Sequence, residues 1–135
     1  MKMFKSVSIV LLMWAVTAAN GQALPPSVWS IAQATDLRTG FQVDYHGSFT
    51  VHGDSVMWKQ KNVEVDYFFR IIGVSGQWSD PDSKGRVLLD VVFRGRPGTM
   101  EFSGDGVDRR VRIRMESGER DLLPYVFSVS GVEKI

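Results

Sequence analysis

The sequence predicts a single all-β domain of seven or eight antiparallel strands. Three observations point to this class: apolar and polar residues alternate along most of the chain, glycine-containing turns separate the alternating runs, and no amphipathic helix is evident. Short connections force neighbouring strands to run antiparallel. Such a meander closes most economically into a β-barrel, which removes exposed strand edges, and the alternative is a two-sheet β-sandwich.

Residues 1–23 have the pattern of a secretory signal peptide. Lys2 and Lys5 flank the start, and an uncharged, largely apolar run follows over residues 7–19. That run is shorter than the roughly 20 residues that a membrane-spanning helix needs. We therefore expect an exported protein, periplasmic or secreted, with no membrane span after the signal is removed.

Small residues at the last and third-last positions of the leader place its cleavage after Gly21 or Ala23, so that residues 24–135 form the antiparallel β domain. The leader carries two of the 16 basic residues and none of the 15 acidic ones, so its removal changes the net charge from +1 to about −1. A near-neutral chain lacks the basic footprint of nucleic-acid-binding proteins. The absence of cysteine excludes disulfides and thiolate metal sites, and a domain of about 112 residues is large enough to fold without them.

The first segment of the domain, residues 27–34, fits either a strand or a short helix. From Gly40 onward the apolar residues recur with a period of two, which predicts strands with one dry and one wet face. The dry faces are assigned to Phe41, Val43, Tyr45, Phe49 and Val51; to Val63, Val65, Tyr67, Phe69 and Ile71; to Val87, Leu89, Val91 and Phe93; to Met100 and Phe102; to Val111, Ile113 and Met115; and to Tyr125, Phe127 and Val129. The residues expected in the core are Tyr67, Phe69, Val91, Phe93, Ile113 and Phe127.

Residues that suit turn geometry separate these runs. The predicted turns are His52-Gly53-Asp54, Gly95-Arg96-Pro97-Gly98, Asp105-Gly106 and Ser117-Gly118. The loop from Asp80 to Gly85 alternates carboxylates as a calcium loop does, but Lys84 takes a ligand position and Val91 stands where a glutamate is required. A polar turn is therefore favoured, and we expect no metal site and no cofactor.

The tryptophans of the domain, Trp29, Trp58 and Trp78, are the candidate ligand-binding residues. Gly76-Gln77-Trp78 matches the G-x-W tripeptide that lipocalins carry on their first barrel strand, where the tryptophan closes one end of the barrel. Here the tripeptide lies in the middle of the chain, so the likeness to lipocalins is one of architecture only. We favour an end plug or a turn-packing residue for Trp78 over a ligand contact.

One predicted strand carries the residue types of a hydrolase. They are Asp44, His46, Ser48, Thr50 and His52, at alternate positions that share a face. Residues two apart on a strand lie about 6.5 to 7 Å apart, which is too far for the contacts of a catalytic triad. The two histidines would be about 20 Å apart on a straight strand, too far to share a zinc ion. A solvated strand face is therefore favoured. We favour a protein without catalytic activity over an enzyme.

The most distinctive local feature is a run of three arginines at alternate positions, Arg110, Arg112 and Arg114. Guanidinium groups spaced along one strand face bind anionic partners through bidentate contacts. The alternative, which we favour, is that cross-strand carboxylates neutralise the face. The candidate carboxylates are those of Glu101, Glu119 and Asp121.

Three functions remain open. The favoured one is a noncatalytic exported binding protein that holds a small hydrophobic or amphipathic ligand in an apolar barrel interior or an aromatic-lined mouth. The second is a protein or polysaccharide interaction module that meets an envelope or extracellular partner through the arginine face and through exposed Trp29 or Trp58. The third is an exported hydrolase. A continuous cavity would favour the first function. A solid core with an unpaired arginine face would favour the second. A cleft that joins a histidine to an acid and a hydroxyl would favour the third.

Overall fold

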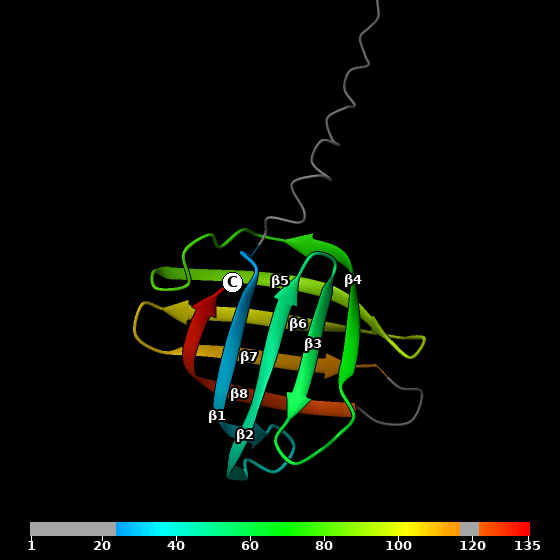
Figure 1. Cartoon of the computed structure of the whole chain (residues 1–135). Coiled ribbons are helices and arrows are strands. Elements are labelled where there is room, and N and C mark those ends of the chain that lie inside the picture. Colours follow the sequence, from blue (N-terminus) through cyan, green and yellow to red (C-terminus); the bar gives the residue numbers. More distant parts are fainter. Residues whose placement is uncertain (1–23, 117–121) are drawn as a thin grey trace, which may run out of the picture.

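Eight antiparallel strands close into a barrel in the computed structural model of the protein, which describes residues 24–116 and 122–135. The strands are β1 (Ser27–Asp36), β2 (Gln42–His52), β3 (Ser55–Gln60), β4 (Tyr67–Ser75), β5 (Lys84–Phe93), β6 (Arg96–Asp105), β7 (Arg109–Met115) and β8 (Leu122–Lys134). Each strand pairs with the next along the chain, and β1 completes the ring by pairing with β8. Figure 1 shows β1 to β4 crossing in front of β5 to β8 at a steep angle. The predicted all-β barrel is therefore confirmed over the alternative sandwich.

Some predictions fall on parts of the chain that the structure does not describe. The signal peptide over residues 1–23, with its cleavage after Gly21 or Ala23, lies outside the described residues, as does the turn expected at residues 117–118. Among the residues that are described, no helix is long and apolar enough to cross a membrane. The segment 27–34, which fitted either a strand or a helix, lies in β1.

The connections between consecutive strands lie alternately at one end of the barrel and at the other. The β1–β2, β3–β4 and β5–β6 connections lie at one end, where β7 also ends and β8 begins, and this end is called the mouth. The β2–β3, β4–β5 and β6–β7 connections lie at the other end, beside the start of β1 and the end of β8 (Figure 1). That end is called the closed end.

Apolar side chains at alternate strand positions fill the interior. Of the six residues predicted for the core, Phe69, Val91, Ile113 and Phe127 are buried, and Tyr67 and Phe93 are partly buried against them. The other large side chains that are fully buried include Trp29, Phe49, Met100 and Phe102. The period of two thus identifies the core wherever a strand has a neighbour on each side.

The strand predicted over residues 63–71 is displaced in the structure. β3, which the pattern did not single out, follows the β2–β3 turn, and β4 begins only at Tyr67. Val63 and Val65 therefore lie in the β3–β4 connection and are exposed, so their assignment to a dry face is wrong. Alternation continues through this connection, and backbone pairing alone separates loop from strand.

The start of β2 also departs from the prediction. Phe41 and Val43, assigned to the dry face, are 74% and 52% exposed. β2 pairs with β1 as far as Gln42 but with β3 only as far as Gly47, so its first residues have lost one neighbouring strand. This part of the β1–β2 hairpin extends past the barrel wall at the lower edge of Figure 1. Phe41 and Val43 are exposed because no strand covers that side.

The turns at Gly53 and Gly106 are confirmed, whereas the turn predicted over residues 95–98 is wrong in position. The β5–β6 connection consists of Arg94 and Gly95 alone, and β6 begins directly afterwards. Both residues have positive φ, 53° and 78°. Two positive values are what a type I′ hairpin turn requires.

Candidate functional site

The closed end of the barrel is plugged by two tryptophans. The rings of Trp29 and Trp78 pack with centroids 5.5 Å apart, and Trp29 meets Phe102 edge-on at 5.0 Å. The Trp78 indole lies over Gly85 and Gly104, where an added Cβ would come within 2.1 and 2.9 Å of its ring. The two glycines leave the space that the indole fills, so Trp78 acts as an end plug.

Aromatic rings continue from the plug towards the mouth. The centroid of the Trp58 ring lies 5.7 Å from those of Phe49 and Phe127, and Phe69 stacks on Phe93 at 4.8 Å. Aromatic pairs at these separations add to the stabilisation that burial alone provides. Because these rings fill the middle of the barrel, space for a ligand lies at the mouth.

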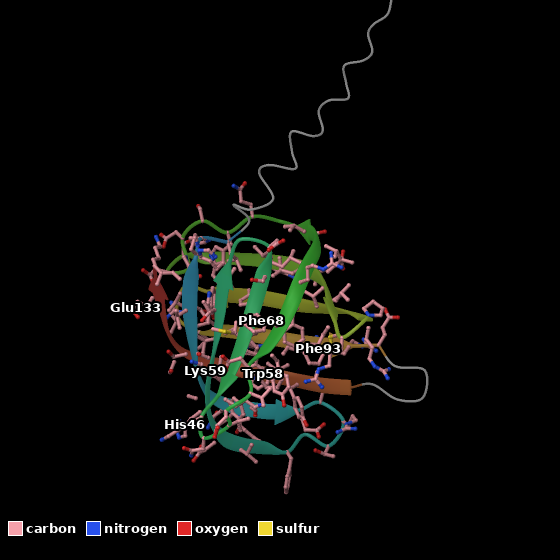
Figure 2. The ribbon with its side chains drawn as sticks, turned by 45° about the vertical axis from the view of Figure 1, so that its right-hand side comes forward. His46, Trp58, Lys59, Phe68, Phe93 and Glu133 are labelled. Atoms are coloured by element: carbon pink, nitrogen blue, oxygen red, sulfur yellow. The ribbon has the colours of Figure 1, made fainter. Side chains whose placement is uncertain are left out.

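A pocket of about 350 Å³ opens at the mouth. The described residues that line it are Trp58, Gln60, Tyr67, Phe93, Arg94, Arg96 and Met115. In Figure 2, Trp58 and Phe93 mark the pocket, and His46 lies apart from it on the outside of the barrel. Small-molecule sites span roughly 300 to 1,000 Å³ and combine apolar walls with a few polar groups. The pocket fits the lower part of that range and has this composition.

A hydrogen bond fixes the indole of Trp58 against Tyr45. The Nε1 atom of Trp58 donates to the phenolic oxygen of Tyr45 at 2.9 Å. The Tyr45 ring folds across Gly47, where a Cβ would come 2.9 Å from the ring. Burial raises the pKa of Tyr45 to about 12, although the hydrogen bond from Trp58 opposes the shift. The raised pKa keeps the phenol protonated well into the alkaline range, and its hydrogen bond holds the Trp58 indole in the pocket wall.

The β5–β6 turn brings cationic groups to the rim of the pocket. The guanidinium carbon of Arg94 lies 4.9 Å from the centroid of the Phe93 ring and 5.5 Å from that of the Tyr67 ring. Both distances fall within cation–π range. Arg96, at the start of β6, lines the same pocket. The rim therefore combines positive charge with aromatic surface.

Met115 supplies the β7 side of the pocket. Its side chain is buried, and Gly98, its partner across the β6–β7 pair, leaves space for it. A Cβ at Gly98 would lie 2.4 Å from the Met115 sulfur. The flexible, polarisable thioether of methionine adapts to apolar surfaces of different shape.

The three tryptophans predicted to bind a ligand do not form one site. Trp58 lines the mouth pocket, whereas Trp29 and Trp78 pack together at the closed end. All three are buried, so the expectation that Trp29 and Trp58 present exposed aromatic surface to a partner is wrong.

The predicted arginine face of β7 is exposed, and it consists of Arg110, Arg112 and Arg114. Arg112 lies opposite Glu101 across the β6–β7 pair, but Glu101 forms its ion pair with Arg86. The other carboxylates considered, Glu119 and Asp121, lie outside the described residues. The face therefore flanks an ion pair that belongs to the neighbouring strands β5 and β6.

The residues considered for a hydrolase lie along the outside of β2, and they are Asp44, His46, Ser48, Thr50 and His52. His52 pairs with Ser55 beside the β2–β3 turn at the closed end, whereas His46 lies beyond the last β2–β3 pair on the mouth side. The two histidines thus lie towards opposite ends of the barrel. Within the described ranges, no group of three or more histidine or acidic side chains is placed to hold a metal ion.

Gln60, Arg94 and Arg96 line the pocket although the sequence pattern does not predict them as site residues. No sequence pattern marks Gln60, because its role depends on where β3 ends. The Arg94–Gly95 pair is marked by a pattern, since it occupies the place of the Asn-Gly or Asp-Gly pair that type I′ turns favour. An arginine in such a turn is a reason to examine what its side chain contacts.

Eight-stranded barrels host many unrelated activities, so the fold by itself identifies no function. Known proteins add no family to this description, because no family model matches the chain and no curated protein or solved structure shows significant similarity to it.

Proposed function

We propose that this chain is an exported, noncatalytic binding protein that holds a small hydrophobic or amphipathic ligand in the mouth pocket. One observation carries the proposal: an aromatic pocket of about 350 Å³ opens at one end of a barrel whose other end is plugged by Trp78. The proposal is limited to the mouth, since aromatic side chains fill the middle of the barrel.

The walls of the pocket suit an apolar ligand. Trp58, Tyr67, Phe93 and Met115 offer apolar surface, and each Å² that a ligand removes from water contributes about 25 cal/mol. Trp58 is held in place by Tyr45, so little ordering of the wall is needed on binding. The amide of Gln60 and the rim arginines supply polar contacts for an amphipathic ligand.

The chemistry of the lining favours binding over catalysis. Among the described lining residues there is no carboxylate, histidine, serine or threonine, so the usual partners of a hydrolytic nucleophile are missing from this group. Export is supported by the signal-peptide pattern of residues 1–23. Intact-mass measurement of the exported protein tests it, with a chain beginning at Gln22 or Leu24 expected and one retaining residue Met1 contradicting it.

A titration with N-phenyl-1-naphthylamine, a neutral dye that fluoresces in apolar surroundings, tests the binding proposal. The wild-type protein should bind it saturably at one site per chain. Gln60→Trp places a large ring in the pocket and should weaken binding about tenfold or more, which corresponds to about 1.4 kcal/mol. Lys59→Trp, on the exposed side of the same strand, is the matched control and should bind as the wild type does. Absence of saturable binding, or equal effects of the two substitutions, would count against the proposal.

A second candidate is the interaction module. It is favoured by the exposure of the arginine face and by the engagement of Glu101 with Arg86 rather than with Arg112. A polyanionic or acidic partner would match such a face. Loss of that partner on replacement of the three arginines, together with weakening by salt, is the expected result for this candidate.

A further inference from the structure

We infer that the ligand of the mouth pocket carries an anionic headgroup, which Arg94 and Arg96 bind at the rim while its apolar body lies against the aromatic walls. This inference rests on the proposed function and adds the chemical class of the ligand. The shared chemistry is one anionic group, a carboxylate, sulfate or phosphate, on an apolar chain or ring.

The backbone at Arg94 is the first observation. Its φ of 53° lies in the left-handed region, and Gly95 follows with 78°. Turns of this geometry favour asparagine, aspartate or glycine at the first central position, because a longer L side chain is sterically disfavoured there. Backbone outliers of this kind concentrate at ligand-binding positions. An arginine at this position therefore points to a use for its side chain.

The position of the guanidinium is the second observation. It lies over the rings of Phe93 and Tyr67, both of which line the pocket. Stacking against two rings holds the planar guanidinium at the rim, and the fork of N–H donors matches the oxygens of a carboxylate or phosphate. A headgroup bound there would leave its apolar body beside Trp58 and Met115.

The local charge is the third observation. The ion pairs among the described residues engage Arg38, Arg86 and Arg109. None of these ion pairs involves Arg94 or Arg96. Two positive charges beside an apolar pocket favour an anionic amphiphile. A neutral ligand would not form ion pairs with the two arginines, and a cationic ligand would be repelled by them.

Calorimetric titration with octanoate and octanol, which share an apolar chain, separates the headgroup from the body. The wild-type protein should bind octanoate about 5- to 10-fold more tightly than octanol, because both arginines are partly screened by solvent. Arg94→Asn with Arg96→Gln should remove that preference, because it should weaken octanoate binding more than octanol binding. Asparagine suits the turn, so this variant keeps the hairpin. Octyl sulfate is run in parallel, and tighter binding of either anion than of octanol supports the inference and names the headgroup.

The control variant is Arg110→Gln with Arg112→Gln, which makes the same change in net charge on the outside of β7. It should leave all affinities unchanged. Equal wild-type affinities for octanol and both anions, or equal losses of all ligands in the Arg94/Arg96 variant, would overturn the anionic headgroup while leaving the proposed function standing. Absence of binding by every ligand would overturn the proposed function itself.

Discussion

Phe68 and Phe69 are adjacent in β4 but lie on opposite faces of the barrel wall, with Phe68 60% exposed and Phe69 fully buried. Phe69→Ala should lower the free energy of unfolding by about 3 to 5 kcal/mol, because it removes a ring that stacks on Phe93 and leaves a cavity. Phe93→Ala should cost less, since Phe93 is only partly buried beside the pocket. Phe68→Ala is the matched control and should cost less than about 1 kcal/mol. Chemical denaturation measures all three, and a loss under about 1 kcal/mol for Phe69→Ala would show that its face is wrongly assigned.

The glycine beneath the Trp78 plug gives a second prediction. An alanine Cβ at Gly85 would come 2.1 Å from the indole ring, which must then move. Gly85→Ala should destabilise the protein by about 1 to 3 kcal/mol, as overpacked core positions do. Gly131→Ala, in β8, meets nothing within 4 Å and should be nearly neutral. Equal melting temperatures for the two variants would show that Trp78 does not lie over β5.

The pH dependence of stability tests the burial of Tyr45. Its pKa in the folded protein is about 12, above the ordinary value of 10.0, so the folded state holds the phenolic proton more tightly than the unfolded state. The contribution of this proton binding to the free energy of unfolding is complete below about pH 10. It should be lost as the pH rises towards about 12. The free energy of unfolding of Tyr45→Phe should fall less steeply over that pH interval. Denaturation curves between pH 9 and about 12 provide the comparison, and identical slopes for both proteins would argue against a buried phenol.

Replacement of Arg110, Arg112 and Arg114 with glutamine separates a solvated strand face from a working surface. We expect the triple variant to keep its melting temperature within a few degrees, because exposed ion pairs each contribute about 0 to 1 kcal/mol. We also expect it to bind octanol as the wild-type protein does. A salt-sensitive partner lost on this replacement would favour the interaction module, and unfolding of the variant would show that the arginines are partly buried.

Much of the fold follows from the pattern of residues in strands that have two neighbours. Phe69, Val91, Ile113 and Phe127 were assigned correctly because period-two alternation coincides with pairing on both sides. The same alternation misled at Val63, since loop residues can alternate without any partner strand. Alternation is a local property, whereas burial depends on which strand lies alongside.

The pocket was harder to predict, because its residues come from five different strands and one turn. Trp58 was a candidate from its size alone, while Tyr67 and Phe93 were expected in the core, which they only partly join. The roles of Gln60 and Arg94 depend on where β3 ends and where the β5–β6 turn begins. Those boundaries are set by strand register, which a single sequence determines least well.

Binding at the mouth can be tested most directly with the indole N–H signals of the domain. Residues 24–135 contain three tryptophans, and only Trp58 lines the pocket, whereas Trp29 and Trp78 lie at the closed end. In ¹H–¹⁵N spectra recorded during a titration with octanol, the Trp58 indole signal should shift saturably while the signals of Trp29 and Trp78 stay in place. A saturable shift of Trp29 or Trp78 without Trp58, or no shift of any indole signal, would contradict a ligand site at the mouth of the barrel.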